Sequence, residues 1–198
     1  MTTKEFTHLA GQQTGTILNT RLLGTLGILG SSMLLVEGLY AGFQEHGTDQ
    51  FIGLLEVIYM TAWMSSIAGL GLTKAAGKGW RGKTVLIIQL IGLMMAAAWS
   101  AIHLVVPNPD EEHILYTIGD IAWPFSHMFM NIVGIAVLRA KVWTGWRRFT
   151  PFWCGLALPA AMLTAVIAGE VALGIVFGLW TTAAFALLGY AVRTSREA

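Results

Sequence analysis

The chain has 198 residues, of which 55% are hydrophobic and only 12% are charged, with a formal net charge of +1. About a quarter of the residues of a soluble domain are charged, so this composition excludes an ordinary soluble globule and indicates a membrane protein. No basic arm or aromatic-basic motif points to a nucleic-acid partner. The single Cys154 excludes an internal disulfide and a CxxC metal pair.

Uninterrupted apolar runs of about 20 residues predict membrane-spanning helices. In chain order the runs cover residues 22–43, 51–72, 85–106, 114–138, 152–168 and 171–192. Only Gly169 and Glu170 separate the last two runs, but one helix over both would be about 60 Å long, twice the bilayer core. We therefore expect two spans with a tight turn near Gly169.

The sequence thus predicts an all-α integral membrane protein, a bundle of six transmembrane helices in one domain over residues 21–193. An N-terminal segment, 1–20, and a tail, 194–198, flank this domain. A signal peptide is the alternative interpretation of the first run, with cleavage of residues 1–41 after Ala41. Leu39 would then occupy the −3 position, where cleavage requires a small residue, so we expect the run to remain as a span.

The basic residues are distributed on one side of this arrangement. All twelve Lys and Arg lie before the first run, after the sixth, or in the connections between runs two and three and runs four and five. The other connections contain none, and the positive-inside rule therefore predicts that both termini and the basic connections are cytoplasmic. The fourth and fifth runs, with the connection Gly145-Trp146-Arg147-Arg148, look similar to small bacterial multi-span proteins, so we expect a multi-pass protein of a bacterial cytoplasmic membrane.

The fourth run contains polar residues that lipid would not accept. Asp120, Pro124, His127 and Asn131 follow one another at helical spacing and form one stripe. Ionisable groups near the bilayer centre cost several kcal/mol when they face lipid, roughly 2.5–3.5 in insertion measurements. The stripe is therefore expected to face the bundle interior or water.

Other spans supply partners at similar depth. At about 1.5 Å per residue, Glu37, Glu56, His103 and Asp120 lie roughly 5–10 Å below the outer surface, and His127 alone lies near the midplane. This predicts an outward-open acidic vestibule lined by spans one to four, with His127 at its floor. Protonated carboxyls, His–carboxylate pairs or a bound cation would make such a vestibule tolerable.

Two functional hypotheses arise from this vestibule. In the first, the protein binds and transports protons, a cation or a small polar solute. Asp120, His127 and Asn131 would then form the binding or relay groups, and the Pro124 break would suit a transporter, where sites lie at discontinuous helices. In the second, an enzyme acting at the outer leaflet would use a divalent metal or acid–base chemistry at Glu56, His103 and Asp120.

Two further interpretations are less favoured or less specific. A b-type haem requires axial histidines at equal heights, whereas His103 and His127 differ by roughly 15 Å, which leaves only His46 or His113 as partners of His103. The polar residues would otherwise hydrogen-bond between helices in an accessory subunit of a larger membrane complex, or in a homo-oligomer packed through Gly174 and Gly178.

Overall fold

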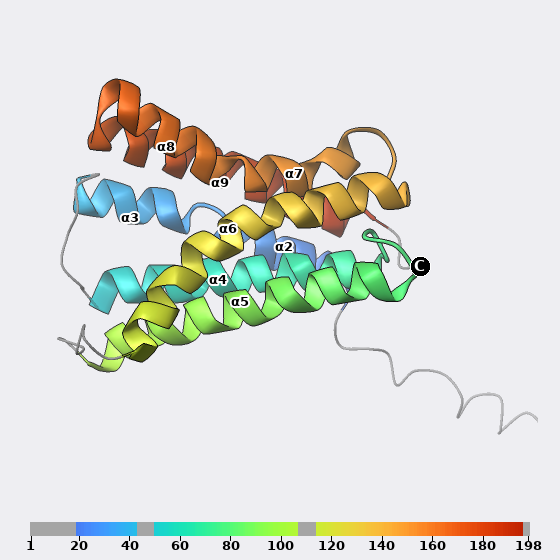
Figure 1. Cartoon of the computed structure of the whole chain (residues 1–198), viewed down its shortest axis with the longest axis horizontal. Helices are drawn as coiled ribbons and strands as arrows, with labels where there is room; N and C mark the ends of the chain where they lie inside the picture. Colours follow the sequence, from blue (N-terminus) through green and yellow to red (C-terminus); the bar gives the residue numbers. More distant parts are fainter. Residues whose placement is uncertain (1–18, 43–49, 107–113, 196–198) are drawn as a thin grey trace, which may run out of the picture.

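The computed structural model in Figure 1 describes residues 19–42, 50–106 and 114–195 of the chain. Every regular element in these ranges is helical. In chain order the elements are α2 (Thr20–Gly30), α3 (Met33–Ala41), α4 (Gln50–Leu72), α5 (Trp80–Val105), α6 (Ile114–Ala140), the 3₁₀ helix η1 (Gly145–Phe149), α7 (Thr150–Gly155), α8 (Ala157–Ala168) and α9 (Glu170–Arg193). The all-α prediction is therefore confirmed for the described part of the chain.

The helices agree closely with the predicted apolar runs. Five segments are long and apolar enough to cross a membrane: Thr20–Ala41, Gln50–Leu72, Trp80–Val105, Thr117–Ala140 and Glu170–Arg193. A bent pair, Gly145–Gly155 and Ala157–Ala168, gives a sixth if it is counted as one span. The turn between α8 and α9 falls at Gly169, whose φ of +86° lies in the region open to glycine.

The first span is two helices, because α2 and α3 are separated at Ser31 and Ser32. The Ser31 hydroxyl donates to the Ile28 carbonyl at 2.7 Å, and the Ser31 amide approaches the same oxygen at 3.3 Å. Serine hydroxyls that bond to nearby carbonyls compete with the regular helical ladder. The break allows the two halves of this span to pack differently.

The fifth span is also broken, with a bend of 50° between its two halves. Pro159 has no amide hydrogen, so the Gly155 carbonyl loses the donor that a regular helix would supply. The Asn131 side-chain amide replaces it, donating to that carbonyl at 2.9 Å. A Cβ on Gly155 would lie 2.7 Å from the Asn131 side chain, so the glycine allows this close contact.

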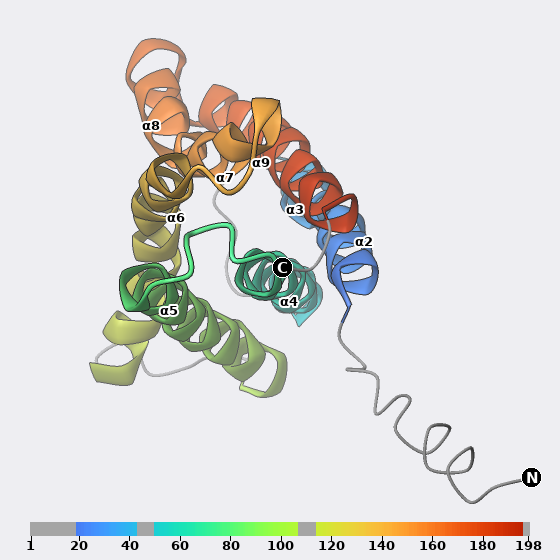
Figure 2. The same cartoon turned by 90° about the vertical axis from the view of Figure 1, so that its right-hand side faces the viewer.

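The helices form a ring around a buried centre (Figure 2). The first span lies between α4 and α9, α5 lies between α4 and α6, and α7 and α8 lie between α6 and α9. Contacts between α4 and α9 also cross the ring. Large side chains from these two helices fill the centre, among them Tyr59, Trp63 and Phe185.

The described chain begins and ends at the same end of the bundle. The Thr20 hydroxyl donates to the Ser195 carbonyl at 3.2 Å, which places the start of α2 beside the end of α9. The α4–α5 and α6–η1 connections lie at this end too, on the right in Figure 1. The basic residues flank these helix ends, so we call it the basic end. The opposite end, where α3 ends and α9 begins, is called the acidic end.

Candidate functional site

The fold divides the polar stripe of α6. Asp120 is exposed, His127 has no exposed surface, and Asn131 is half-buried against the Gly155 carbonyl. Asn131 is therefore engaged in supporting the bend of the fifth span. These three side chains share a helix face in sequence, but they do not line a common space.

His127 lies at the centre of the ring, and both of its nitrogens have partners. Nδ1 lies 3.2 Å from the Trp123 carbonyl oxygen, and Nε2 lies 3.3 Å from the Tyr59 hydroxyl. A carbonyl oxygen only accepts hydrogen bonds, so we assign the ring proton to Nδ1, with the Tyr59 hydroxyl donating to Nε2. This arrangement corresponds to a neutral imidazole that links α4 to α6.

Aromatic rings from α4, α6 and α9 surround this imidazole. The ring centroids closest to it belong to Trp123, at 4.4 Å, and Trp63, at 4.6 Å. Phe177 lies at 5.3 Å, and Tyr59 and Phe185 each lie at 6.2 Å. We call these five rings the aromatic cage. An apolar cage of this kind makes a charged imidazole costly, in agreement with the neutral form.

The ionisable residues predicted at shallow depth lie near one another at the acidic end. Glu37 on α3 is within electrostatic range of Glu56 on α4, and Glu56 is within range of Asp120 on α6. His103 on α5 is within range of Asp120. These groups, from α3, α4, α5 and α6, therefore gather at the acidic end.

The predicted metal site of Glu56, His103 and Asp120 depends on how closely these side chains approach one another. In the described part of the chain, no three His, Cys, Asp or Glu side chains are grouped so that they could hold a metal ion. The predicted set of Glu56, His103 and Asp120 is accordingly not assembled into such a group. His46 and His113, the other candidate haem ligands, lie outside the described residues.

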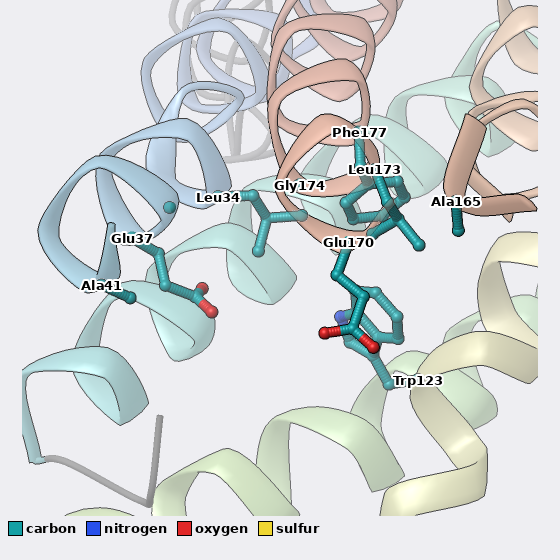
Figure 3. Close-up of a pocket in the computed structure, with 10 residues that line it drawn as sticks. Leu34, Glu37, Ala41, Trp123, Ala165, Glu170, Leu173, Gly174 and Phe177 are labelled. Atoms are coloured by element: carbon teal, nitrogen blue, oxygen red, sulfur yellow. The ribbon is translucent and has the colours of Figure 1, made fainter. Parts of the chain in front are cut away.

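A cavity of about 420 Å³ lies inside the acidic end, between α3, α6, α8 and α9. Figure 3 shows the carboxylates of Glu37 and Glu170 pointing into it from α3 and α9. The residues that line the cavity are Leu34, Glu37, Gly38, Ala41, Trp123, Ala165, Glu170, Leu173, Gly174 and Phe177. Since Glu170 is exposed, the cavity reaches the molecular surface.

The cavity ends on the aromatic cage. Trp123 and Phe177 line it, their ring centroids lie 5.4 Å apart, and both rings also contact the His127 imidazole. His127 is thus behind the floor of the cavity and not part of its surface. The lining comes from spans one, four, five and six, whereas the sequence had suggested spans one to four.

Some residues of the site were not identified as such from the sequence. Trp123 precedes His127 by one helical turn, and Tyr59 is one turn beyond Glu56, so periodicity offered a weak signal for both. Glu170 entered the sequence analysis only as one of the two residues that separate the last two apolar runs. Phe177 has no polar group and no distinctive spacing, and only the packing of α9 against α6 and α4 brings it to the site.

Comparisons with protein-family models, with curated proteins and with solved structures find no match to this chain. The function proposed for the chain therefore rests on the geometry of its site.

Proposed function

We propose that the chain is an integral membrane protein of six spans, with both termini and the basic connections in the cytoplasm of a bacterium. The lengths of the helices and the gathering of Lys and Arg at one end support this topology. The contact between Thr20 and Ser195 also supports it, because an even number of spans returns the chain to its starting side. The acidic end would then face away from the cytoplasm.

The function that the site supports best is uptake of a cation from the acidic end. One observation carries this proposal: a cavity that reaches the surface has the carboxylates of Glu37 and Glu170 on its wall and the aromatic cage at its floor. Carboxylates in a cavity with low-dielectric walls concentrate cations there. A transporter or a gated channel needs a binding site inside the bundle and a barrier that closes the path beyond it, and the cavity and its floor provide these two features.

The broken helices are consistent with transport. Many transporters place their sites at discontinuous spans, whose halves can move separately. Both interrupted spans of this chain border the cavity, since α3 supplies Leu34, Glu37, Gly38 and Ala41, and α8 supplies Ala165. The motion that opens one side and closes the other would use the breaks at Ser31–Ser32 and near Leu156.

The aromatic cage would act as the gate of this pathway. The Tyr59–His127 hydrogen bond connects α4 to α6 directly behind the cavity floor. A cation could pass toward the basic end only if the floor rings Trp123 and Phe177 separate from His127. We therefore assign the gating contact to Tyr59 and His127, and the entry site to Glu37 and Glu170.

Charge movement in proteoliposomes tests this proposal. Purified protein is adsorbed on a solid-supported membrane and given concentration jumps of protons, Na⁺, K⁺ and methylated ammonium ions in turn. We expect at least one of these cations to produce a current, and Glu37→Gln and Glu170→Gln to reduce it. Lys78→Gln is the control, because it also removes one charge but lies in the α4–α5 connection, away from the cavity.

The outcomes are distinct. A wild-type protein that gives no current with any of these cations would contradict the transport proposal. A current that survives both glutamate substitutions would remove the cavity from the pathway.

A further inference from the structure

The cavity that serves as the proposed entry site has an unusual wall for a cation site, because most of its lining is apolar. Besides Glu37 and Glu170, it is lined by the aromatic rings of Trp123 and Phe177 and the aliphatic side chains of Leu34 and Leu173. Figure 3 shows the two carboxylates on separate helices on either side of the open space, with Trp123 near Glu170 and Phe177 on the α9 side.

This wall does not suit a small inorganic cation. Ca²⁺ takes about 6–8 oxygen ligands, and Mg²⁺ about six at short distances. The cavity side chains offer carboxylate oxygens from only two residues, set among carbon surfaces. A bare ion would leave most of its coordination sphere facing hydrocarbon, at a high desolvation cost.

The same wall suits an ammonium ion that carries alkyl groups. Ammonium and guanidinium cations are attracted to the faces of Trp, Tyr and Phe within about 6 Å, and aromatic surfaces recognise quaternary ammonium ligands in this way. The alkyl groups would bury apolar surface against Leu34 and Leu173, while the positive charge would be balanced by the carboxylates. A volume of about 420 Å³ is ample for a small ligand of this class, because ligand pockets begin at about 300 Å³.

Two buried polar atoms at the cavity wall lack a partner. Glu37 Oε2 and Trp123 Nε1 are buried, and neither has a hydrogen-bond partner within the described part of the chain. Such atoms are expensive to leave unsatisfied, roughly 1–3 kcal/mol each. Both residues line the cavity, and a small rotation of their side chains would let a cationic ligand satisfy the carboxylate oxygen and a hydroxyl on that ligand accept from the indole N–H.

We propose that the cavity binds a small alkylated ammonium ion, held by the Glu37 and Glu170 carboxylates against the rings of Trp123 and Phe177. This inference rests on the proposed function, since it names the class of cation for the same entry site. It predicts selectivity for ligands that combine a positive charge with apolar groups.

Calorimetric titration of the detergent-purified protein tests the inference. The probes are choline, tetramethylammonium, Na⁺, K⁺ and 3,3-dimethyl-1-butanol, which has the shape of choline without its charge. We expect saturable binding of choline and tetramethylammonium, with choline the tighter of the two, and no binding of the neutral analogue or the alkali ions.

Substitutions locate the ligand. Glu37→Gln should weaken choline binding by at least about thirtyfold, as expected when one partner of a buried charge pair is removed. Trp123→Leu should weaken it by about two- to thirtyfold through loss of the cation–π contact. Trp123→Phe keeps a ring and should retain most of the affinity, and Trp80→Phe is the matched control because Trp80 is 72% exposed.

The results separate this inference from the proposed function. Equal binding of choline and its neutral analogue, or choline binding that is unchanged by Glu37→Gln, would overturn the inference. Currents with protons or alkali cations alone, without choline binding, would overturn it while leaving the transport proposal intact. Choline binding that depends on Glu37, without any current, would support the inference and contradict transport.

Discussion

The two halves of the first span meet α9 in opposite ways. Near the basic end, Gly24 and Gly27 of α2 face Gly189 of α9 so closely that a Cβ on Gly189 would lie 2.7 Å from the Ile28 amide nitrogen. Near the acidic end, Gly38 of α3 and Gly174 of α9 line an open cavity. Glycines thus allow the backbones of α2 and α9 to touch, whereas between α3 and α9 they border an open space.

This difference shows what the break at Ser31–Ser32 does for the molecule. A single straight helix would carry the close α2–α9 contact toward the acidic end and reduce the space there. The close contact with α9 lies on α2, and the cavity is lined by α3 on the other side of the break. A Cβ on Gly178 would lie 3.2 Å from Leu35 Cδ1, so α3 and α9 still pack together at this level. The close contact and the cavity therefore lie on opposite sides of the break at Ser31–Ser32.

The largest expected effect comes from disrupting the close contact between α2 and α9 near the basic end. Gly189→Leu would place a large side chain against the backbone of α2, where nearby backbone atoms cannot rotate away. Overpacking costs about 1–3 kcal/mol, and more when backbone must move, so we expect loss of the monodisperse peak in size-exclusion chromatography. Gly189→Ala should remain folded with a lower thermal midpoint.

Gly79→Ala is the matched control for that pair, because a Cβ at Gly79 meets no described atom within 4 Å. It should leave the elution profile and the midpoint unchanged. A monodisperse Gly189→Leu protein with the wild-type midpoint would contradict the close α2–α9 contact.

The second effect concerns the aromatic cage, which forms the floor of the cavity. Tyr59→Phe removes the hydroxyl that donates to His127 Nε2 and leaves a fully buried acceptor unsatisfied. Such a change costs about 1–3 kcal/mol, whereas removing both partners together costs less. Thermal unfolding of Tyr59→Phe, His127→Leu and the double variant measures this coupling.

We expect the double variant to be more stable than the sum of the two single effects predicts. Strict additivity would show that the Tyr59–His127 hydrogen bond does not link α4 to α6. Tyr190→Phe, at an exposed tyrosine of α9, serves as the control for removing a hydroxyl.

The smallest effect is a difference in labelling that leaves stability unchanged. Ala165 and Ala161 lie one turn apart on α8, but Ala165 lines the cavity and Ala161 is fully buried. In whole cells, a membrane-impermeant cationic thiosulfonate should label Ala165→Cys and not Ala161→Cys. Native Cys154 is fully buried and should stay unlabelled.

The charge of the reagent sharpens this experiment. The carboxylates of the cavity should make the cationic reagent react about tenfold faster, or more, than an anionic thiosulfonate of similar size. Equal rates for the two reagents would contradict an acidic entry site. Labelling of Ala165→Cys only from the cytoplasmic side, in inverted vesicles, would contradict the proposed orientation.

The sequence by itself determined where the long apolar segments lie, but not the breaks within the first and the fifth, because hydropathy is local in the chain. Apolar runs set the positions of the spans, and Gly169 sets the turn between the last two. Lys and Arg lie at the two termini and in every second connection. Because successive helices run in opposite directions, these places all meet at one end of the bundle. These features need only hydropathy, length and charge, which a neighbour in space does not alter.

The tertiary structure alone decided which polar groups share a space. Asp120, His127 and Asn131 have the spacing of one face, yet the tilt and rotation of α6 send them to the surface, to the aromatic cage and to the Gly155 carbonyl. The packing of α9 likewise brought Phe177 to the site and Glu170 to the cavity wall. Rotation and separation of helices arise from contacts between residues far apart in sequence, and no single span contains that information.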